Sequence, residues 1–317
     1  MATQICTEKI KLNTGQLMPA VGYGTWQGKP GSEASKELQD AILYALEQGY
    51  RHIDTAAAYL VEPEVGYAVN KSGIPREELF IVTKLWNADH DKAEEAFLKS
   101  LENLKTDYID LWLMHFPQAN DEFGAALEHP TPAETWLAME AVIKKYPTKL
   151  RAIGVSNFSK KTIDELLAVA TIKPAVNQVE IHPMWPQPEL RRYFDQLGIH
   201  ITAYSPLGQW DSPLLTHPDI IAIAEKYNVG VGTLILSWAL SLGISIIPKS
   251  ARKERITANI NLIKKLDPQD KKFFDEFYLQ KGMHRRLCLV GDGSRPTGHE
   301  LVFGWTYEQL GWDTFSI

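Results

Sequence analysis

The sequence is poor in cysteine and has no long apolar run. Cys6 and Cys288 are its only cysteines, too few for a framework of disulfides or for a zinc site built from cysteine pairs. No stretch of about 18 apolar residues occurs, as a membrane-spanning helix would need. The first residues contain no apolar segment typical of a signal peptide. We therefore expect a cytoplasmic protein without a membrane partner.

Positive charge is also scarce relative to negative charge. The 33 Lys and Arg residues are outnumbered by 39 Asp and Glu residues, which gives a formal net charge of -6 at pH 7. Proteins that bind nucleic acids usually carry a basic surface, so this balance argues against a nucleic-acid partner. The Gly-x-Gly-x-x-Gly, Walker and His-Glu-x-x-His motifs are missing. A Rossmann dinucleotide site, a P-loop and a metal site are therefore not expected.

The sequence does contain short apolar segments that alternate with amphipathic ones along its length. The apolar segments are rich in β-branched residues and bounded by turn residues, which is typical of strands buried on both faces. We predict strands at 20–24, 51–54, 79–84, 108–115, 152–155, 175–179, 199–204 and 244–248. We predict helices at 34–47, 93–104, 132–145, 160–170, 188–197 and 233–242.

This alternation predicts the fold. Strands that alternate with helices favour a parallel sheet, and about eight such units in roughly 250 residues favour a closed barrel over an open sheet. The expected fold class is α/β, with residues 1–317 forming a single (β/α)8 TIM barrel. Residues 7–18, with a turn at 13–15, predict a β-hairpin before the barrel. Residues 279–317, rich in Gly, Pro and aromatic residues, predict a long C-terminal loop.

Polar side chains follow the predicted strands at the ends where such a barrel carries its active site. A polar residue at any one strand end is ordinary, because loops are polar. Here the side chains at many of the strand ends can ionise or form hydrogen bonds. Because these strand ends meet at one rim of a barrel, they predict a single polar site. In chain order these residues are Asp54, Lys84, His115, Ser156, Asn157, Gln178, Tyr204, Lys249 and Ser250.

Longer motifs around these residues make the sequence resemble the aldo-keto reductase family along nearly its whole length. In the first half the matching stretches are Gly22-Tyr23-Gly24-Thr25-Trp26, 49–56 with Tyr59, Thr83-Lys84-Leu85-Trp86, 108–111 and His115-Phe116-Pro117. In the second half they are 154–158, Asn177-Gln178-Val179-Glu180, 203–208 and Ile247-Pro248-Lys249-Ser250. The resemblance implies a (β/α)8 barrel that reduces a carbonyl group with NADPH.

The resemblance also implies a catalytic tetrad of Asp54, Tyr59, Lys84 and His115. Tyr59 would donate a proton to the carbonyl oxygen. An ordinary tyrosine pKa near 10 is high for a proton donor at about pH 7. We therefore expect the Lys84 ammonium to lower the pKa of Tyr59, and Asp54 to keep Lys84 charged. His115 would donate a hydrogen bond to the substrate oxygen.

The cofactor implied by the resemblance is NADPH or NADP. Tyr204 would stack on the nicotinamide ring. Ser156, Asn157 and Gln178 would form hydrogen bonds with the carboxamide group of the nicotinamide. The 2′-phosphate suits hydroxyl, ammonium and guanidinium groups, and the residues that resemble its site are Lys249, Ser250 and Arg255. The remaining cofactor contacts implied by the resemblance are Thr25, Trp26, Ser205, Leu207 and Asn259.

Two positions depart from the family pattern. Ala258 stands where many members have a glutamate before the asparagine. An acidic contact to the adenosine is therefore missing, and we expect an altered cofactor affinity with NADPH still preferred. After Tyr59 this chain has Leu60-Val61-Glu62, whereas many relatives have an asparagine before the glutamate. The conformation of that loop is left open.

Aromatic and cationic side chains predict the substrate pocket. Trp26, Trp86, Phe116 and Trp210 are candidates for its walls, although packing alone explains each of them equally well. Arg285 and Arg286 could hold a substrate carboxylate, as in a uronic acid, or the loop itself. The segment 204–249 is most similar to fungal aldehyde and sugar-acid reductases. D-galacturonate and glyceraldehyde are therefore candidate substrates, both within carbohydrate metabolism.

We predict an NADPH-dependent enzyme that reduces a small sugar-like aldehyde to an alcohol. Two alternatives remain open. One is a barrel that binds NADPH without catalysis, which the complete tetrad disfavours. The other is an NADP-dependent dehydrogenase that oxidises an alcohol, because the same site catalyses both directions. We expect a monomer, with a weak dimer as the alternative.

Overall fold

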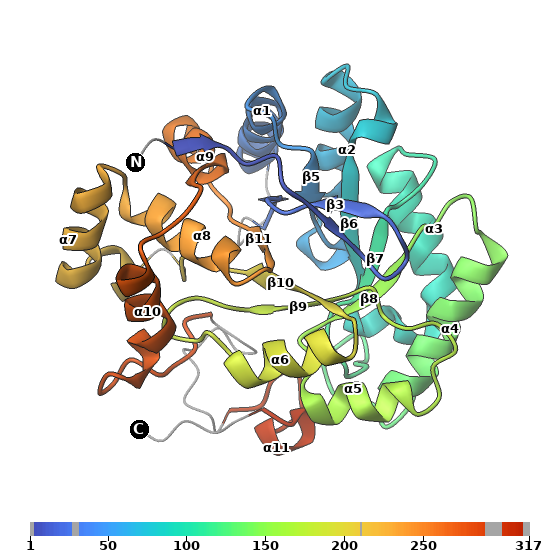
Figure 1. Cartoon of the computed structure of the whole chain (residues 1–317). Helices are drawn as coiled ribbons and strands as arrows, with labels where there is room; N and C mark the ends of the chain where they lie inside the picture. The colour runs from blue at the N-terminus through green and yellow to red at the C-terminus, as the bar shows by residue number, and fades with distance from the viewer. Residues whose placement is uncertain (1–2, 27–31, 210, 289–299, 313–317) are drawn as a thin grey trace.

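The computed structural model describes residues 3–26, 32–209, 211–288 and 300–312. Eight strands form one sheet in the order β11-β10-β9-β8-β7-β6-β5-β4, and all neighbouring strands are parallel. The two ends of the sheet also meet: Ile246 N donates to Ala20 O, and Gly22 N donates to Ile246 O, both over 2.8 Å. The predicted closed barrel is therefore confirmed, with its helices outside the strands (Figure 1).

The eight barrel strands overlap the eight predicted segments. They are β4 (Tyr23–Gly24), β5 (His52–Asp54), β6 (Phe80–Leu85), β7 (Leu111–Met114), β8 (Ile153–Ser156), β9 (Val176–Glu180), β10 (His200–Tyr204) and β11 (Ser245–Ile247). Their apolar residues are buried on both faces, because side chains inside the barrel pack on one another and those outside pack on helices.

The six predicted helices are confirmed as α1 (Ser32–Glu47), α3 (Ala93–Leu104), α4 (Pro132–Lys145), α5 (Lys160–Leu167), α6 (Pro188–Gln196) and α8 (Val231–Ser241). Their starts follow capping chemistry. Thr131 and Ser159 accept hydrogen bonds from the third amides of α4 and α5 in complete capping boxes. In α3, Phe97, Leu101 and Leu104 are buried at spacings of four and three residues, which places them on one face.

Within the described residues five helices were not predicted: α2 (Glu62–Lys71), α7 (Pro218–Tyr227), α9 (Lys253–Ile260), α10 (Pro268–Glu276) and the single turn α11 (Tyr307–Leu310). A proline lies in the first turn of α2, α7 and α10, a start signal that sequence reasoning could have used. The loop left open after Tyr59 is short. Leu60 adopts a left-handed conformation with φ 57°, and α2 begins two residues later.

The predicted hairpin is confirmed, and it closes one end of the barrel. Strands β2 (Lys9–Lys11) and β3 (Leu17–Pro19) pair antiparallel. Leu12 and Met18 pack with Phe80 and Leu111, which lie at the first residues of their strands. The hairpin therefore covers the amino ends of the strands. The uncovered end of the barrel is formed by the carboxyl ends of the strands, which we call the C-terminal rim.

Outside the barrel, β1 (Thr3–Ile5) pairs antiparallel with β12 (Asn261–Ile263). The C-terminal segment beyond α10 is mostly irregular in its described parts, 279–288 and 300–312, as predicted. One turn of helix, α11 (Tyr307–Leu310), interrupts it after a capping box at Thr306. Within the described ranges no single helix is both long and apolar enough to span a membrane, and α7 and α8 reach that composition only as a pair bent by 86°.

Candidate active site

A buried ion pair lies at the C-terminal rim. Asp54 is the last residue of β5, and Lys84 is near the end of the neighbouring β6. Lys84 Nζ is 2.6 Å from Asp54 Oδ1 and donates to Thr55 O over 2.8 Å. The Lys84 side chain is 0% exposed. Because a buried charge is costly without partners, each of these two groups stabilises the charged form of the other.

Tyr59 and His115 flank this pair. Tyr59 ends the 3-10 turn η1 (Ala57–Tyr59) that follows β5, and His115 follows β7. Lys84 Nζ lies 5.1 Å from the centre of the Tyr59 ring. The Tyr59 ring packs edge-on against the His115 ring, with the two ring centres 5.6 Å apart. The structure therefore brings the four predicted catalytic side chains into one cluster.

The pKa of Tyr59 shifts in the direction opposite to the sequence-based expectation. Burial raises the pKa of the phenol above its ordinary value, and the nearby Asp54 carboxylate raises it further. Lys84 does not reverse this shift, because its ammonium is paired with Asp54 and burial lowers the pKa of Lys84 as well. The prediction of an acidified phenol was wrong for this structure. Tyr59 is instead held protonated, as a proton donor must be before reaction.

His115 is held neutral. Burial lowers its pKa well below the ordinary value, and the positive charge of Lys84 contributes to the shift. Its Nδ1 is buried and has no hydrogen-bond partner among the described residues. An unpaired lone pair there is less costly than an unpaired N–H, so we assign the ring proton to Nε2. His115 can therefore donate one hydrogen bond from Nε2.

The four residues predicted at the nicotinamide join the tetrad in one hydrogen-bond network. Gln178 Nε2 donates to Asp54 Oδ2 over 2.7 Å, and Ser156 Oγ donates to Gln178 O over 2.8 Å. Asn157, with φ 65°, donates from Nδ2 to the backbone oxygen of His115 over 2.9 Å. Tyr204 donates from its hydroxyl to Asn157 Oδ1 over 2.9 Å. The Tyr204 ring can stack on a planar aromatic ring, and the hydroxyl and amide groups of the other three residues can form hydrogen bonds with a carboxamide.

The predicted 2′-phosphate residues lie together beyond β11. Lys249 and Arg255 are exposed, and within the described ranges neither forms an ion pair with a carboxylate. Ser250 Oγ accepts from Arg252 N over 3.1 Å and so orders the loop. Helix α9 begins there without a side-chain cap, which leaves its first amides and its positive dipole end available to an anion. These residues fit a phosphate dianion.

The other predicted cofactor residues differ in their burial. Thr25 is fully buried, and its Oγ1 donates to Asp54 O over 3.0 Å. Trp26 is 44% exposed, which leaves a ring face available. Ser205 has φ 46° at the start of the loop after β10. Leu207 is partly buried and packs against the core, and Asn259 is buried in α9.

Aromatic rings enclose His115. Trp86 packs edge-on against His115 with ring centres 5.4 Å apart, and Phe116 stacks on it at 5.4 Å. Phe303, from the C-terminal segment, contacts both Trp86 at 5.3 Å and Phe116 at 4.8 Å. Sequence reasoning missed Phe303, because it meets the barrel only through long-range packing. The predicted pocket residue Trp210 lies outside the described residues.

The two arginines predicted to contact substrate are placed differently. Arg285 is exposed. Arg286 is 5% exposed, and its Nη1 lies 3.4 Å from Glu180 Oε2. Its guanidinium lies 3.9 Å from the centre of the Trp312 ring. Arg286 is thus occupied by protein partners, which argues against its predicted role with a substrate carboxylate.

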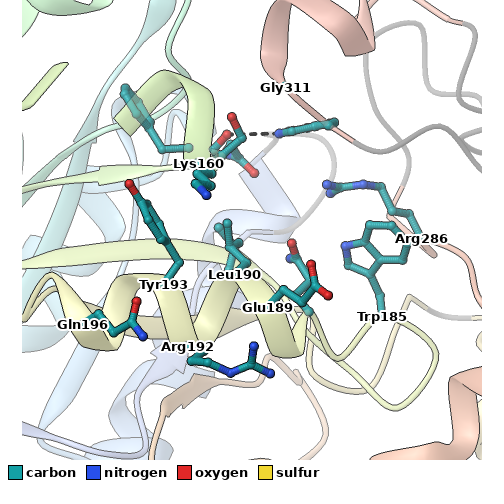
Figure 2. A pocket seen from close by; sticks show the side chains of 15 residues that line it. Lys160, Trp185, Glu189, Leu190, Arg192, Tyr193, Gln196, Arg286 and Gly311 are labelled. Atoms are coloured by element: carbon teal, nitrogen blue, oxygen red, sulfur yellow. Dashed lines mark hydrogen bonds between the residues drawn. The ribbon is translucent and has the colours of Figure 1, made fainter. Parts of the chain in front are cut away.

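A cavity of about 500 Å³ lies beside the rim rather than over the tetrad. Helix α6 forms one wall of it, while Arg286 and Trp185 stand side by side at another (Figure 2). Asn157 and Arg286 are the only predicted site residues among its described lining. In the part of the chain that the structure describes, no cluster of three or more His, Cys, Asp or Glu side chains could hold a metal.

Comparisons with known proteins agree with this geometry. The model of the aldo/keto reductase family matches residues 20–278. A Saccharomyces cerevisiae protein named glycerol 2-dehydrogenase (NADP(+)) is 41% identical over 299 residues, covering 88% of this chain and 93% of its own length. Human aldo-keto reductase family 1 member A1 is 40% identical over 278 residues, covering 80% of this chain and 83% of the human protein.

Solved structures show the same similarity. An aldo-keto reductase from Bombyx mori in complex with NADP superposes with a TM-score of 0.80 at 36% identity, covering 86% of this chain and 94% of that one. The aldose reductase from Schistosoma japonicum gives a TM-score of 0.77 at 32% identity, covering 86% of this chain and 93% of that one. With a family match over most of its length and a barrel rim that carries the matching side chains, this chain belongs to the aldo/keto reductase family of oxidoreductases.

Proposed function

We propose that this chain reduces small, uncharged aldehydes or hydroxyketones with NADPH, and that Tyr59 is the proton donor. The observation that carries the proposal is the buried Lys84–Asp54 pair beside Tyr59 and His115, at the rim where Asn157, Gln178 and Tyr204 also converge. The complex of the Bombyx mori relative with NADP supports the choice of cofactor. The cationic group at Lys249 and Arg255 supports NADPH over NADH.

The mechanism follows from the charges at the rim. When bound, NADPH supplies the hydride to the carbonyl carbon. Tyr59, kept protonated by burial, gives its proton to the carbonyl oxygen as negative charge develops there. Lys84 stabilises the phenolate that Tyr59 becomes, and Asp54 holds Lys84 in place. His115 donates a hydrogen bond from Nε2 to the same oxygen, and Tyr59 regains its proton from solvent.

The pocket walls support an uncharged substrate. Trp86, Phe116 and Phe303 surround His115 with apolar rings, which suit a small aldehyde or the apolar face of a sugar. Arg286, the residue best suited to a uronate, is already paired with Glu180. We therefore favour glyceraldehyde over D-galacturonate within this proposal.

A second candidate is the reverse reaction, oxidation of a small polyol with NADP. The observation that favours it is the 41% identity to a protein named glycerol 2-dehydrogenase (NADP(+)). Oxidation of glycerol at carbon 2 gives a hydroxyketone, which the same cluster of Tyr59, Lys84 and His115 would reduce in the opposite direction.

A substrate panel tests both candidates. NADPH consumption is followed with glyceraldehyde, dihydroxyacetone, D-galacturonate and benzaldehyde, and NADP reduction is followed with glycerol. We expect the uncharged carbonyl compounds to be turned over with a higher kcat/KM than D-galacturonate. If NADPH binds and none of these compounds reacts, the chain is a cofactor-binding barrel without this activity.

A further inference from the structure

Glu180 is a buried carboxylate that the proposed chemistry does not use. It is the last residue of β9, two positions after Gln178, and it is 0% exposed. Its Oε1 accepts hydrogen bonds from the backbone amides of Leu287 over 2.6 Å and Cys288 over 3.0 Å. His182 Nε2 lies 2.9 Å from the same oxygen. A single carboxylate of the barrel therefore binds consecutive residues of the C-terminal segment.

These contacts keep the carboxylate charged. A buried carboxylate is costly unless hydrogen-bond donors and positive charge compensate for lost water. Burial alone would raise the pKa of Glu180, but His182, Arg286 and the amide of Leu287 outweigh it and lower that pKa to about 2. The charged form accepts stronger hydrogen bonds than a neutral acid would. The connection between β9 and the C-terminal segment therefore holds throughout the physiological pH range.

The segment that Glu180 holds covers the loop after β10. Leu287 is 1% exposed, and it packs so tightly on Gly208 that a Cβ there would lie 2.8 Å from Leu287 Cδ1. Burial raises the pKa of the Cys288 thiol, and Ser205 lies close enough to oppose that shift. Cys288 is also close enough to Tyr204 to influence the pKa of that phenol. Tyr204 is predicted to stack on the nicotinamide, and Ser205 is one of the other predicted cofactor contacts.

The same segment reaches the other side of the nicotinamide region through Arg286. The Arg286 guanidinium lies between two indole rings, 3.9 Å from the centre of Trp312 and 4.9 Å from that of Trp185. Trp312 Nε1 donates to the backbone oxygen of Asn157 over 3.3 Å. Figure 2 shows Arg286 and Trp185 together at the edge of the cavity. Residues 286–288 thus touch the surroundings of both Asn157 and Tyr204.

We propose that Glu180 is a positioning residue that fixes residues 286–288 across the 205–208 loop, and that this contact slows the departure of the nicotinamide cofactor. The inference rests on the proposed function, because it takes the 205–208 loop as part of the cofactor site. Leu287 packs against Gly208, so a movement of the loop away from Leu287 must break this contact. Release of the cofactor then requires the segment to detach from Glu180.

Glu180→Gln tests the proposal, because it keeps the size of the side chain and removes the charge. We expect NADPH to leave about tenfold faster in stopped-flow fluorescence, since hydrogen bonds to a charged group are the stronger ones. The rate of hydride transfer in a single turnover should change less than about twofold, because Glu180 does not touch the tetrad. Limited proteolysis without cofactor should cleave the C-terminal segment faster.

Two further variants keep the test decisive. Glu276→Gln removes an exposed carboxylate near Lys272 and should match the parent protein in all three measurements. Leu287→Ala leaves the charge of Glu180 intact, removes the packing on Gly208, and should also speed release. An unchanged rate of NADPH release in both Glu180→Gln and Leu287→Ala would overturn the proposal. A fall in the rate of hydride transfer as large as the change in release would also overturn it, because it would indicate a general structural defect.

The outcomes separate this inference from the proposed function. If the parent protein binds NADPH but reduces no carbonyl compound, the proposed activity fails while the release rates still decide the role of Glu180. If the parent protein binds no NADPH, both the proposed function and the role in cofactor release are refuted.

Discussion

Gln178 Nε2 donates a hydrogen bond over 2.7 Å to Asp54 Oδ2, the carboxylate oxygen that Lys84 does not contact. Asp54 therefore has one partner on each oxygen, an ammonium on one side and an amide on the other. This arrangement fixes the direction in which the Lys84 ammonium points. It also joins the residues predicted to contact the nicotinamide to the predicted tetrad, so substitutions in the two groups should not be additive.

The buried ion pair makes a prediction about stability. Lys84→Met leaves Asp54 as an unpaired buried charge, which should lower the free energy of unfolding by about 3–5 kcal/mol. The double variant Lys84→Met/Asp54→Asn should recover a large part of this loss, because the remaining charge is gone. Urea unfolding of the three proteins measures both effects. Lys99→Met removes an exposed partner of Glu102 and should change stability little. No loss in Lys84→Met would contradict the pairing.

Tyr59→Phe tests the proton donor. Because phenylalanine has no proton to give, kcat for aldehyde reduction should fall by about 100-fold to 10,000-fold. The affinity for NADPH, measured by tryptophan fluorescence, should stay within about twofold, since the ring and its packing on His115 are kept. Tyr67→Phe, at an exposed tyrosine on α2, serves as the matched control. Undiminished turnover in Tyr59→Phe would remove this residue from the mechanism.

Lys249→Met and Arg255→Met test the 2′-phosphate site. Each should weaken NADPH binding by about tenfold or more, because a charge-assisted contact to phosphate is lost. NADH, which lacks that phosphate, should bind almost as before. Titration of each variant with both cofactors gives the comparison. Lys253→Met removes a nearby cation whose ammonium lies over the Tyr44 ring instead, and should spare both affinities. Equal losses for NADPH and NADH would refute the assignment.

Buried histidines predict loss of stability in acid. Burial lowers the pKa of His90 to about 3 and that of His200 to about 4, whereas the unfolded chain has values near 6.5. Below about pH 6.5 the unfolded chain therefore takes up protons that the folded chain does not. Each histidine should lower the free energy of unfolding by ~1.4 kcal/mol per pH unit, down to its folded pKa.

Urea unfolding at about pH 7, 6 and 5 measures this slope. His90→Gln can keep the contact with Thr135 without a titrating ring, so its slope should be shallower than that of the parent protein. His129→Gln, at an exposed histidine paired with Glu134, should not show this flattening. A slope in His90→Gln as steep as in the parent protein would rule out His90 as a contributor.

The barrel and its rim were predictable because their signals are local. Each strand is a short β-branched run, and each predicted catalytic side chain lies within a few residues of a strand end. Helix α2 was missed because no motif match covered the residues after Tyr59, although Pro63 marked its start. Phe303 and the true partner of Arg286 could not be found in the same way. Both depend on where a distant C-terminal segment folds back, which no local pattern determines.

The hairpin at the amino ends of the strands has a practical consequence. Its turn carries Gly15 with φ 87°, and a Cβ built there meets no other atom within 4 Å. Exposed turns of this kind tolerate insertions. A peptide tag inserted between Thr14 and Gly15 would project from the end of the barrel farthest from Tyr59. Molecules attached to a surface or a sensor through that tag would all present their open face to the solution.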